Sequence, residues 1–126
     1  MQFYICFFLS LFFCHAQLSY TTIKLPSELE ETSGLEFIGE HLLTNNDSGD
    51  KPRLYEFTTD GDLIRNFRFY GLKNRDWEDL AADELHYYIA DTGNNFATRE
   101  NLRIHILSKD LVPEGTIHIQ YKAQKT

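Results

Sequence analysis

Short stretches of alternating apolar and polar residues dominate the chain, and helical periodicity is scarce. Apolar or aromatic residues occupy every second position in RLYEFT (53–58), DLIRNFRF (62–69), LRIHILS (102–108) and TIHIQYK (116–122). A half-buried β-strand requires this period of two, because successive side chains point to opposite faces of a sheet. Asp60-Gly61 is a favoured hairpin turn between the first two stretches, and Pro113 and Gly115 interrupt the chain between the last two. The pattern predicts an all-β protein.

A repeat of about 45 residues organises these strands. Leu35 aligns with Leu80 (80 − 35 = 45), and Asp47-Ser48-Gly49 aligns with Asp91-Thr92-Gly93 (91 − 47 = 44). Each copy continues through a loop of variable length to a third and a fourth strand. Four short strands at this period are typical of a β-propeller blade, and chance similarity of two generic hairpins is the alternative. The repeat favours a strand for EDLAA (78–82), although propensity alone favours a helical turn capped by Asp76.

The expected architecture is about two four-stranded antiparallel blades of an incomplete propeller. Blade one covers about 34–70 and blade two about 77–121, within a region 17–126 that forms the N-terminal part of a propeller. A closed propeller needs about four to eight blades, so the missing blades are expected partners. The alternating segment YTTIKL (20–25) predicts a further strand that would complete a missing last blade.

The first sixteen residues predict a secretory signal peptide. MQFYICFFLSLFFCHA contains no charged side chain, and its apolar run from Phe3 to Phe13 is short of the ~20 residues that a membrane span needs. Cys14-His15-Ala16 ends in the small-x-small pattern of a cleavage site, so the exported chain begins at Gln17. A signal anchor is the alternative, because no Lys or Arg precedes the run. Cleavage would leave no stable membrane span, and the protein is expected in the periplasm, at the cell surface or outside the cell.

Charge and cysteine content narrow the classes of function. Both cysteines lie in the signal segment, so the exported part has neither a disulfide framework nor a cysteine zinc cluster. The formal net charge of −7 argues against a nucleic-acid partner and is compatible with a bound cation. The sequence carries no histidine-pair zinc motif, no Gly-x-Ser-x-Gly elbow and no phosphate-binding glycine loop. The classes of ligand that stay compatible with the sequence are a small molecule, a glycan and a protein.

Carboxylates and amides recur where the predicted strands begin and end. The candidate metal ligands are Glu36, Glu78 and Asp79 at the starts of the innermost strands, and Asp47, Asp91 and Asn94 where the second strands end. Strand ends of successive blades converge near the channel mouth of a propeller, and Ca²⁺ prefers such oxygen ligands. The alternative is ordinary turn chemistry, in which Asp caps the turn and Gly supplies a positive φ. Adjacent residues of a strand point to opposite faces, so only one of Glu78 and Asp79 can reach a shared site.

Two further side chains have a functional and a structural interpretation. Trp77, the only tryptophan, could stack on a sugar or a base, or it could fill the gap between two blades. Arg99 could bind an anionic substrate through both of its terminal nitrogens, or it could fix its loop by an ion pair with Asp91 or Glu100.

NNDSG (45–49), LYEFTTDGDLIRNF (54–67), DWEDLAAD (76–83), YYIADTGNN (87–95) and NLRIHIL (101–107) together resemble a group of secreted bacterial β-propeller proteins. Many of these proteins come from Bacteroidetes, and they are similar to phytase-like (esterase-like) and NHL or gluconolactonase-type propellers. The resemblance covers about residues 30–110 and implies a secreted propeller of six blades. Lactonase-type propellers hold a channel metal with Glu, Asn and Asp, so the resemblance also implies a Ca²⁺ that polarises a carbonyl or phosphoryl oxygen.

Two functions are compatible with this resemblance, because the fold serves hydrolases and binding modules alike. The favoured expectation is a secreted or periplasmic binding or scaffold module. The alternative is a Ca²⁺-dependent hydrolase of phosphoesters or lactones. The alternative requires a carboxylate oxygen of Glu36 within about 5 Å of one from Glu78 or Asp79, near enough for both to share one Ca²⁺.

Overall fold

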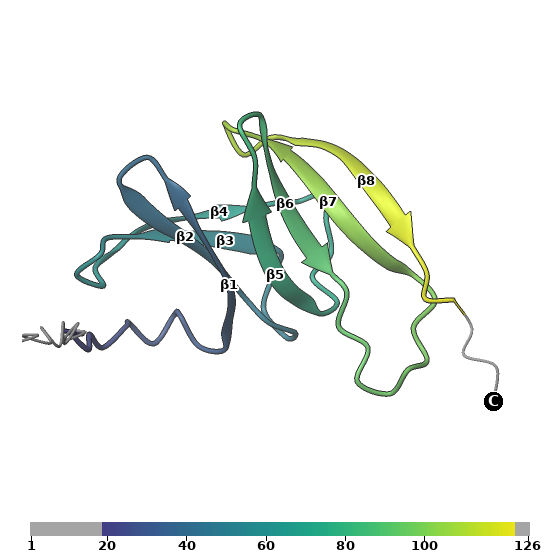
Figure 1. Cartoon of the computed structure of the whole chain (residues 1–126), viewed down its shortest axis with the longest axis horizontal. Helices are drawn as coiled ribbons and strands as arrows, with labels where there is room; N and C mark the ends of the chain where they lie inside the picture. The colour runs from purple at the N-terminus through teal and green to yellow at the C-terminus, as the bar shows by residue number, and fades with distance from the viewer. Residues whose placement is uncertain (1–18, 123–126) are drawn as a thin grey trace, which may run out of the picture.

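The computed structural model describes residues 19–122, which fold into two four-stranded antiparallel sheets (Figure 1). The first sheet contains β1 (Thr32–Ile38), β2 (His41–Asn46), β3 (Arg53–Phe57) and β4 (Leu63–Arg68). The second contains β5 (Trp77–Ala82), β6 (His86–Asp91), β7 (Leu102–Ser108) and β8 (Pro113–Ile119). Within each sheet, every strand pairs with the next along the chain, and the eight strands confirm the all-β prediction. The predicted signal segment 1–16 lies outside the described residues, and within them no helix is long and apolar enough to cross a membrane.

The first two strands of each sheet have the same register. Leu35 of β1 pairs with Thr44 of β2, and 45 positions later Leu80 of β5 pairs with Ile89 of β6. Both first strands also carry a β-bulge, between positions 32 and 35 and between positions 77 and 79. The sequence stretch EDLAA therefore forms a strand and not a helical turn.

The third and fourth strands repeat in the same way at a larger spacing. Leu54 pairs with Phe67, and 50 positions later Ile104 pairs with Ile117 (104 − 54 = 50). A further bulge interrupts both pairs of strands at equivalent places. The two sheets are thus similar units, as the repeat predicted, and the spacing between equivalent residues rises from 45 to 50 across the connection between β6 and β7.

Two sequence predictions were wrong in detail. The registers make Asn46 the counterpart of Asp91, since Asn46 pairs with residue 32 and Asp91 with residue 77. The sequence alignment had matched Asp47 to Asp91, because both begin an Asp-x-Gly turn, and main-chain pairing overrules that similarity by one residue. The segment 20–25 forms no strand. Its Leu25, together with Leu29, packs instead against the Tyr55 and Phe57 side chains of the first sheet.

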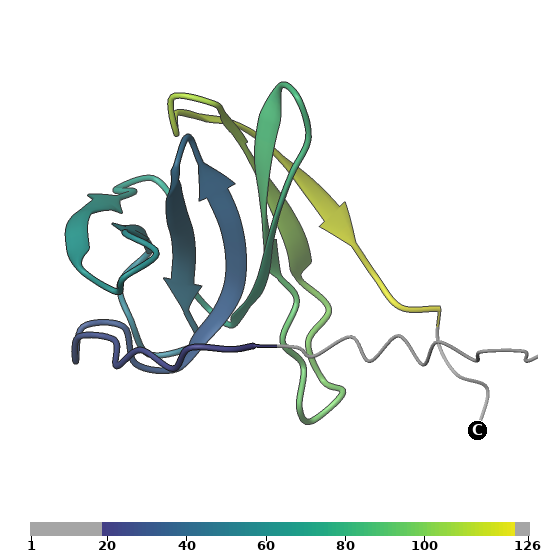
Figure 2. The same ribbon diagram turned by 60° about the vertical axis from the view of Figure 1, so that its left-hand side comes forward.

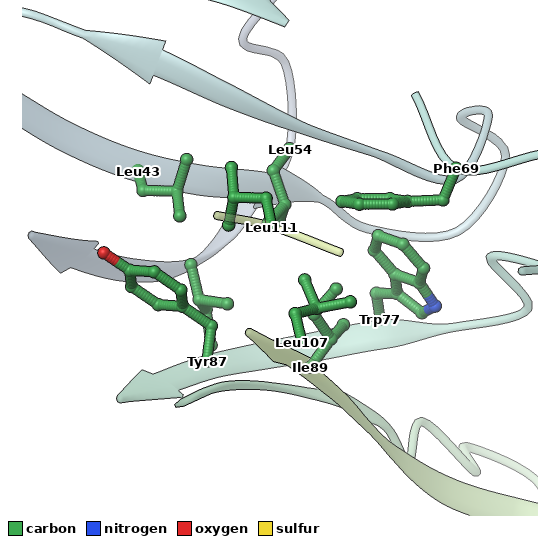
Figure 3. Close-up of a cluster of buried hydrophobic side chains, with 9 residues drawn as sticks. Leu43, Leu54, Phe69, Trp77, Tyr87, Ile89, Leu107 and Leu111 are labelled. Atoms are coloured by element: carbon green, nitrogen blue, oxygen red, sulfur yellow. The ribbon is translucent and has the colours of Figure 1, made fainter. Parts of the chain in front are cut away.

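The two sheets pack against each other around one apolar core (Figures 2 and 3). The core combines Leu43, Leu54 and Phe69 with Trp77, Leu80, Tyr87, Ile89, Leu107 and Leu111. The first strands β1 and β5 contact each other directly. A Cβ atom on Gly34 of β1 would overlap the backbone nitrogen of Leu80, so glycine permits this close approach. Close contact of the first strands brings the chain end of β2 near the start of β5.

Candidate metal site

Three carboxylates form a cluster where the end of β2 lies near the start of β5. One carboxylate oxygen each of Asp47, Asp76 and Glu78 lies within 4.8 Å of the other two, and all three side chains are half-buried. Asp47 directly follows β2, whereas Asp76 and Glu78 flank Trp77 at the start of β5. Oxygens that bind one Ca²⁺ at about 2.3–2.6 Å can be up to about 5 Å apart. The cluster can therefore hold a metal ion, and we call these three residues the acidic cluster.

Asn74, in the linker before β5, holds two parts of the acidic cluster together. Its Nδ2 donates to the backbone carbonyl of Asp47 (2.9 Å), and its Oδ1 accepts from the backbone N–H of Trp77 (3.1 Å). The backbone N–H of Asp47 in turn donates to the carbonyl of Glu31 (3.0 Å). These bonds fix the main chain on both sides of the cluster, so its carboxylates are brought together by the fold and not by a local motif.

The bulge in β5 separates the roles of Glu78 and Asp79. The bulge places Trp77 and Leu80 both in the core. Glu78 belongs to the acidic cluster. Asp79 is exposed, and its Oδ1 accepts from the N–H of the following residue (2.8 Å). Of the two adjacent carboxylates, only Glu78 lies in the cluster.

Gly93 forms one wall of the site. A Cβ atom at this position would overlap the carboxylates of Asp76 and Glu78, and the Gly93 N–H donates to the Asp76 carbonyl (3.1 Å). The expectation that Gly93 supplies a positive φ is wrong, because only Gly39, Gly49 and Gly61 among the described glycines have one. Glycine is needed at position 93 because the main chain approaches two side chains closely.

Asp91 and Arg99 lie beneath the acidic cluster as an ion pair. Asp91 is fully buried, and its Oδ1 accepts from Arg99 Nη2 (2.8 Å) and from the backbone N–H of Asp76 (3.1 Å). Arg99 Nη1 also donates to the Gly93 carbonyl (2.7 Å), so the guanidinium fixes the loop after β6. Asp91 Oδ2 is buried and accepts no hydrogen bond from any described residue. The ion pair positions both Asp76 and Gly93 at the cluster.

Two other candidates lie apart from the acidic cluster. Asn94 closes the loop after β6, since its Oδ1 accepts from the Arg99 N–H (2.8 Å). Glu36 lies near the far end of β5. Burial and, second, the charge of Glu36 raise the pKa of Tyr87, which pairs with Ala82 at that end. Ala82 is four residues from Glu78 along an extended strand, about 13 Å away. Glu36 is not among the residues whose carboxylate oxygens converge within 4.8 Å of one another.

The acidic cluster carries unfavourable charge in the absence of a cation. Burial, followed by a hydrogen bond with Asp47 and the charge of Asp47, raises the pKa of Asp76. Burial and then the charges of Asp47 and Asp76 raise the pKa of Glu78. The Arg99 guanidinium partly offsets these effects at Asp76. A cation bound between the three carboxylates would relieve this repulsion.

Sequence reasoning missed Asp76 as a site residue and treated it only as a potential helix cap. A usable signal was present, because residues i and i+2 of an extended segment point to the same side. Asp76 and Glu78 have this spacing around the buried Trp77.

Comparisons with known proteins do not identify a relative. Searches with the chain found no matching family model, no matching curated protein and no matching solved structure. Inferences about function therefore rest on the geometry of this molecule.

Proposed function

We propose that the chain is an exported β-propeller-type binding module with a Ca²⁺ site formed by Asp47, Asp76 and Glu78. The observation that carries the proposal is the convergence of these three carboxylates within 4.8 Å. All donors are hard oxygens, which suit Ca²⁺ or Mg²⁺ better than zinc or copper. Ca²⁺ is favoured because it accepts irregular geometry, whereas Mg²⁺ demands a near-ideal octahedron.

The propeller assignment is supported by the arrangement of the two sheets. Each sheet is a simple meander of four antiparallel strands, as in a propeller blade. The sheets repeat in register, and their first strands lie next to each other, which is the relation between successive blades around a channel. The acidic cluster then lies at one end of the innermost strands.

A binding role is supported more strongly than hydrolysis. Three carboxylates provide part of the six to eight oxygens that Ca²⁺ takes, and the other positions would accept oxygens of water and of a small molecule, glycan or protein. The hydrolase alternative relied on Glu36 beside Glu78 or Asp79. Glu36 is outside the group of converging carboxylates, so the pair that the alternative required lacks support.

Calorimetric titration of the metal-free protein with CaCl₂ tests the site. We expect a dissociation constant of about 10⁻⁶ to 10⁻⁵ M, in the range of sites tuned by carboxylate number. Glu78→Gln and Asp76→Asn each remove one carboxylate and should weaken binding about tenfold or more. Asp79→Asn is the matched control, because it removes the same charge one residue away from Glu78 and should leave the affinity unchanged. Absence of binding heat in the wild type, or equal loss in the control, would refute the site.

The raised pKa values predict that removing a carboxylate of the cluster stabilises the metal-free protein, although the same substitution weakens Ca²⁺ binding. A carboxyl group with a higher pKa in the folded state loses stability as pH rises from its ordinary pKa through the raised value. Above this window the wild type retains the repulsion, whereas Glu78→Gln does not. In EDTA at pH 7 the variant should therefore unfold a few degrees above the wild type, and saturating Ca²⁺ should reverse the order. The effect is small because solvent screens a half-exposed group.

Thermal unfolding followed by circular dichroism measures both conditions, and a repeat at pH 4 checks the titration. At that pH the difference between the two proteins should shrink, since Glu78 is then largely protonated. A variant that is less stable than the wild type in EDTA at pH 7 would instead identify Glu78 as a structural turn residue.

A further inference from the structure

The second sheet has one packed face and one open face. Leu80, Ile89 and Leu107 lie on the packed face, in the shared core. Along each strand, the intervening positions point the other way. We call this other surface the open face; its apolar residues are Ala81, Tyr88, Ala90, Ile104, Ile106 and Ile117. All six are half-buried or exposed, so the described part of the chain leaves an apolar sheet face in contact with solvent.

The repeat indicates which kind of surface packs on the open face. Tyr88 and Ile104 on the open face are the counterparts of Leu43 and Leu54 in the first sheet, at spacings of 45 and 50. Leu43 and Leu54 are fully buried, because the second sheet covers them. The same surface of the first sheet thus receives a neighbouring sheet. The open face is also more apolar, since Ile106 stands where the first sheet has Glu56.

The complementary surface is present on the other side of the molecule. The second sheet contacts the first through β5, where Leu80 and Ala82 point into the interface. Their counterparts in β1 are Leu35 and Phe37, which point away from the second sheet and are 58% and 62% exposed. Leu25 and Leu29 cover the part of this surface around Tyr55 and Phe57 and leave Leu35 and Phe37 exposed. One chain therefore displays both halves of its own internal sheet-on-sheet interface.

We propose that a second copy of this chain docks its Leu35–Phe37 surface on the open face. The contact continues the packing of the first sheet on the second, and it does not depend on the proposed calcium site. It is head-to-tail, because each copy contributes two different surfaces, and such contacts propagate until a ring closes. Two to four copies would supply the about four to eight sheets of a closed propeller.

Size-exclusion chromatography with light scattering tests the docking on protein purified from an exporting bacterial host. Intact mass shows whether residues 1–16 are still attached. The wild type should form one defined oligomer at about 1–100 µM, the range of a specific but modest interface. Ile104→Asp disables the open face and Phe37→Asp disables the other surface, so each variant alone should be monomeric. Val112→Asp, in the exposed β7–β8 loop, is the control and should assemble like the wild type.

Mixing the two monomeric variants makes the test specific. Each variant keeps the surface that the other has lost, so a one-to-one mixture should give a heterodimer and nothing larger. Circular dichroism verifies that both variants are folded, and Ile106→Asp with Leu35→Asp provides a second pair of substitutions on the same two surfaces. A monomeric wild type at 100 µM, assembly that survives both substitutions, or a mixture of folded variants that stays monomeric would each overturn the proposal.

Discussion

Replacing Trp77 with alanine is expected to destabilise the protein by about 3–5 kcal/mol, the usual range for deletion of a buried Trp side chain. Trp77 is fully buried where the two sheets meet, and its ring centroid lies 6.4 Å from that of Phe69 and 6.1 Å from that of His105. Its indole N–H donates to the Lys73 carbonyl (3.2 Å). The truncation would open a cavity between the sheets and leave that carbonyl without its donor.

Urea denaturation followed by circular dichroism measures this loss. Small domains have a stability of about 5–15 kcal/mol, so the variant should lose a substantial share of it and unfold at lower urea. Phe96→Ala is the control, because Phe96 is 88% exposed and its removal should change stability by no more than about 0.5 kcal/mol. A loss below about 1 kcal/mol for Trp77→Ala would show that the sheets do not depend on this contact. The buried ring offers no free face to a sugar or a base.

The substitution Arg99→Ala should cost about 3–5 kcal/mol, because it leaves a buried carboxylate without its partner. Asp91 is fully buried, and Arg99 Nη2 is 2.8 Å from its Oδ1. Arg99 also holds the Gly93 carbonyl, so the loop after β6 would lose its anchor. We expect Arg99 to act as a structural residue, because its guanidinium is already bonded to Asp91 and to the Gly93 carbonyl.

A double variant separates charge from packing. Adding Asp91→Asn to Arg99→Ala removes the uncompensated charge, so the double variant should recover a substantial part of the lost stability in urea denaturation. The Asp76 N–H would still find an acceptor in the asparagine side chain. If Arg99→Ala alone loses less than about 1 kcal/mol, or if the double variant loses as much as both single variants together, the buried ion pair is not the cause.

The sequence predicted the strands well because their signal is local. Alternation identified the segments that form β3, β4, β7 and β8, and the repeat identified the other four strands. The repeat placed the turn after β2 wrongly by one residue, since Asp47 and Asp91 look alike in the sequence. Only the hydrogen bonding between strands distinguishes them. In the structure, Asp91 forms the buried ion pair with Arg99, whereas Asp47 belongs to the acidic cluster.

The acidic cluster was only partly predictable because it depends on contacts between distant segments. Asp47 and Glu78 were candidates on composition, but their meeting requires the linker bonds of Asn74 and the bulge at the start of β5. The spacing of Asp76 from Glu78 was a local signal, but the meeting of both with Asp47, which precedes Asp76 by 29 residues (76 − 47 = 29), was not. No signal in the sequence indicated the role of Gly93. A side chain is excluded there only because the folded chain places Asp76 and Glu78 against it.

The longer connection between β6 and β7 shows how the molecule could acquire new specificity. The spacing between equivalent residues rises from 45 to 50 across this connection, yet the pairing of β7 with β8 matches that of β3 with β4 residue by residue. Loop closure becomes only slowly more costly as a loop lengthens. Because Gly93 lies at the start of this connection and forms a wall of the acidic cluster, the exposed part of the loop is a natural place for insertion and diversification during evolution or protein engineering. Changes at the exposed residues 95–98, which lie outside the Asp91–Arg99 contacts, would reshape what reaches the cluster and leave the pairing of β7 with β8 intact.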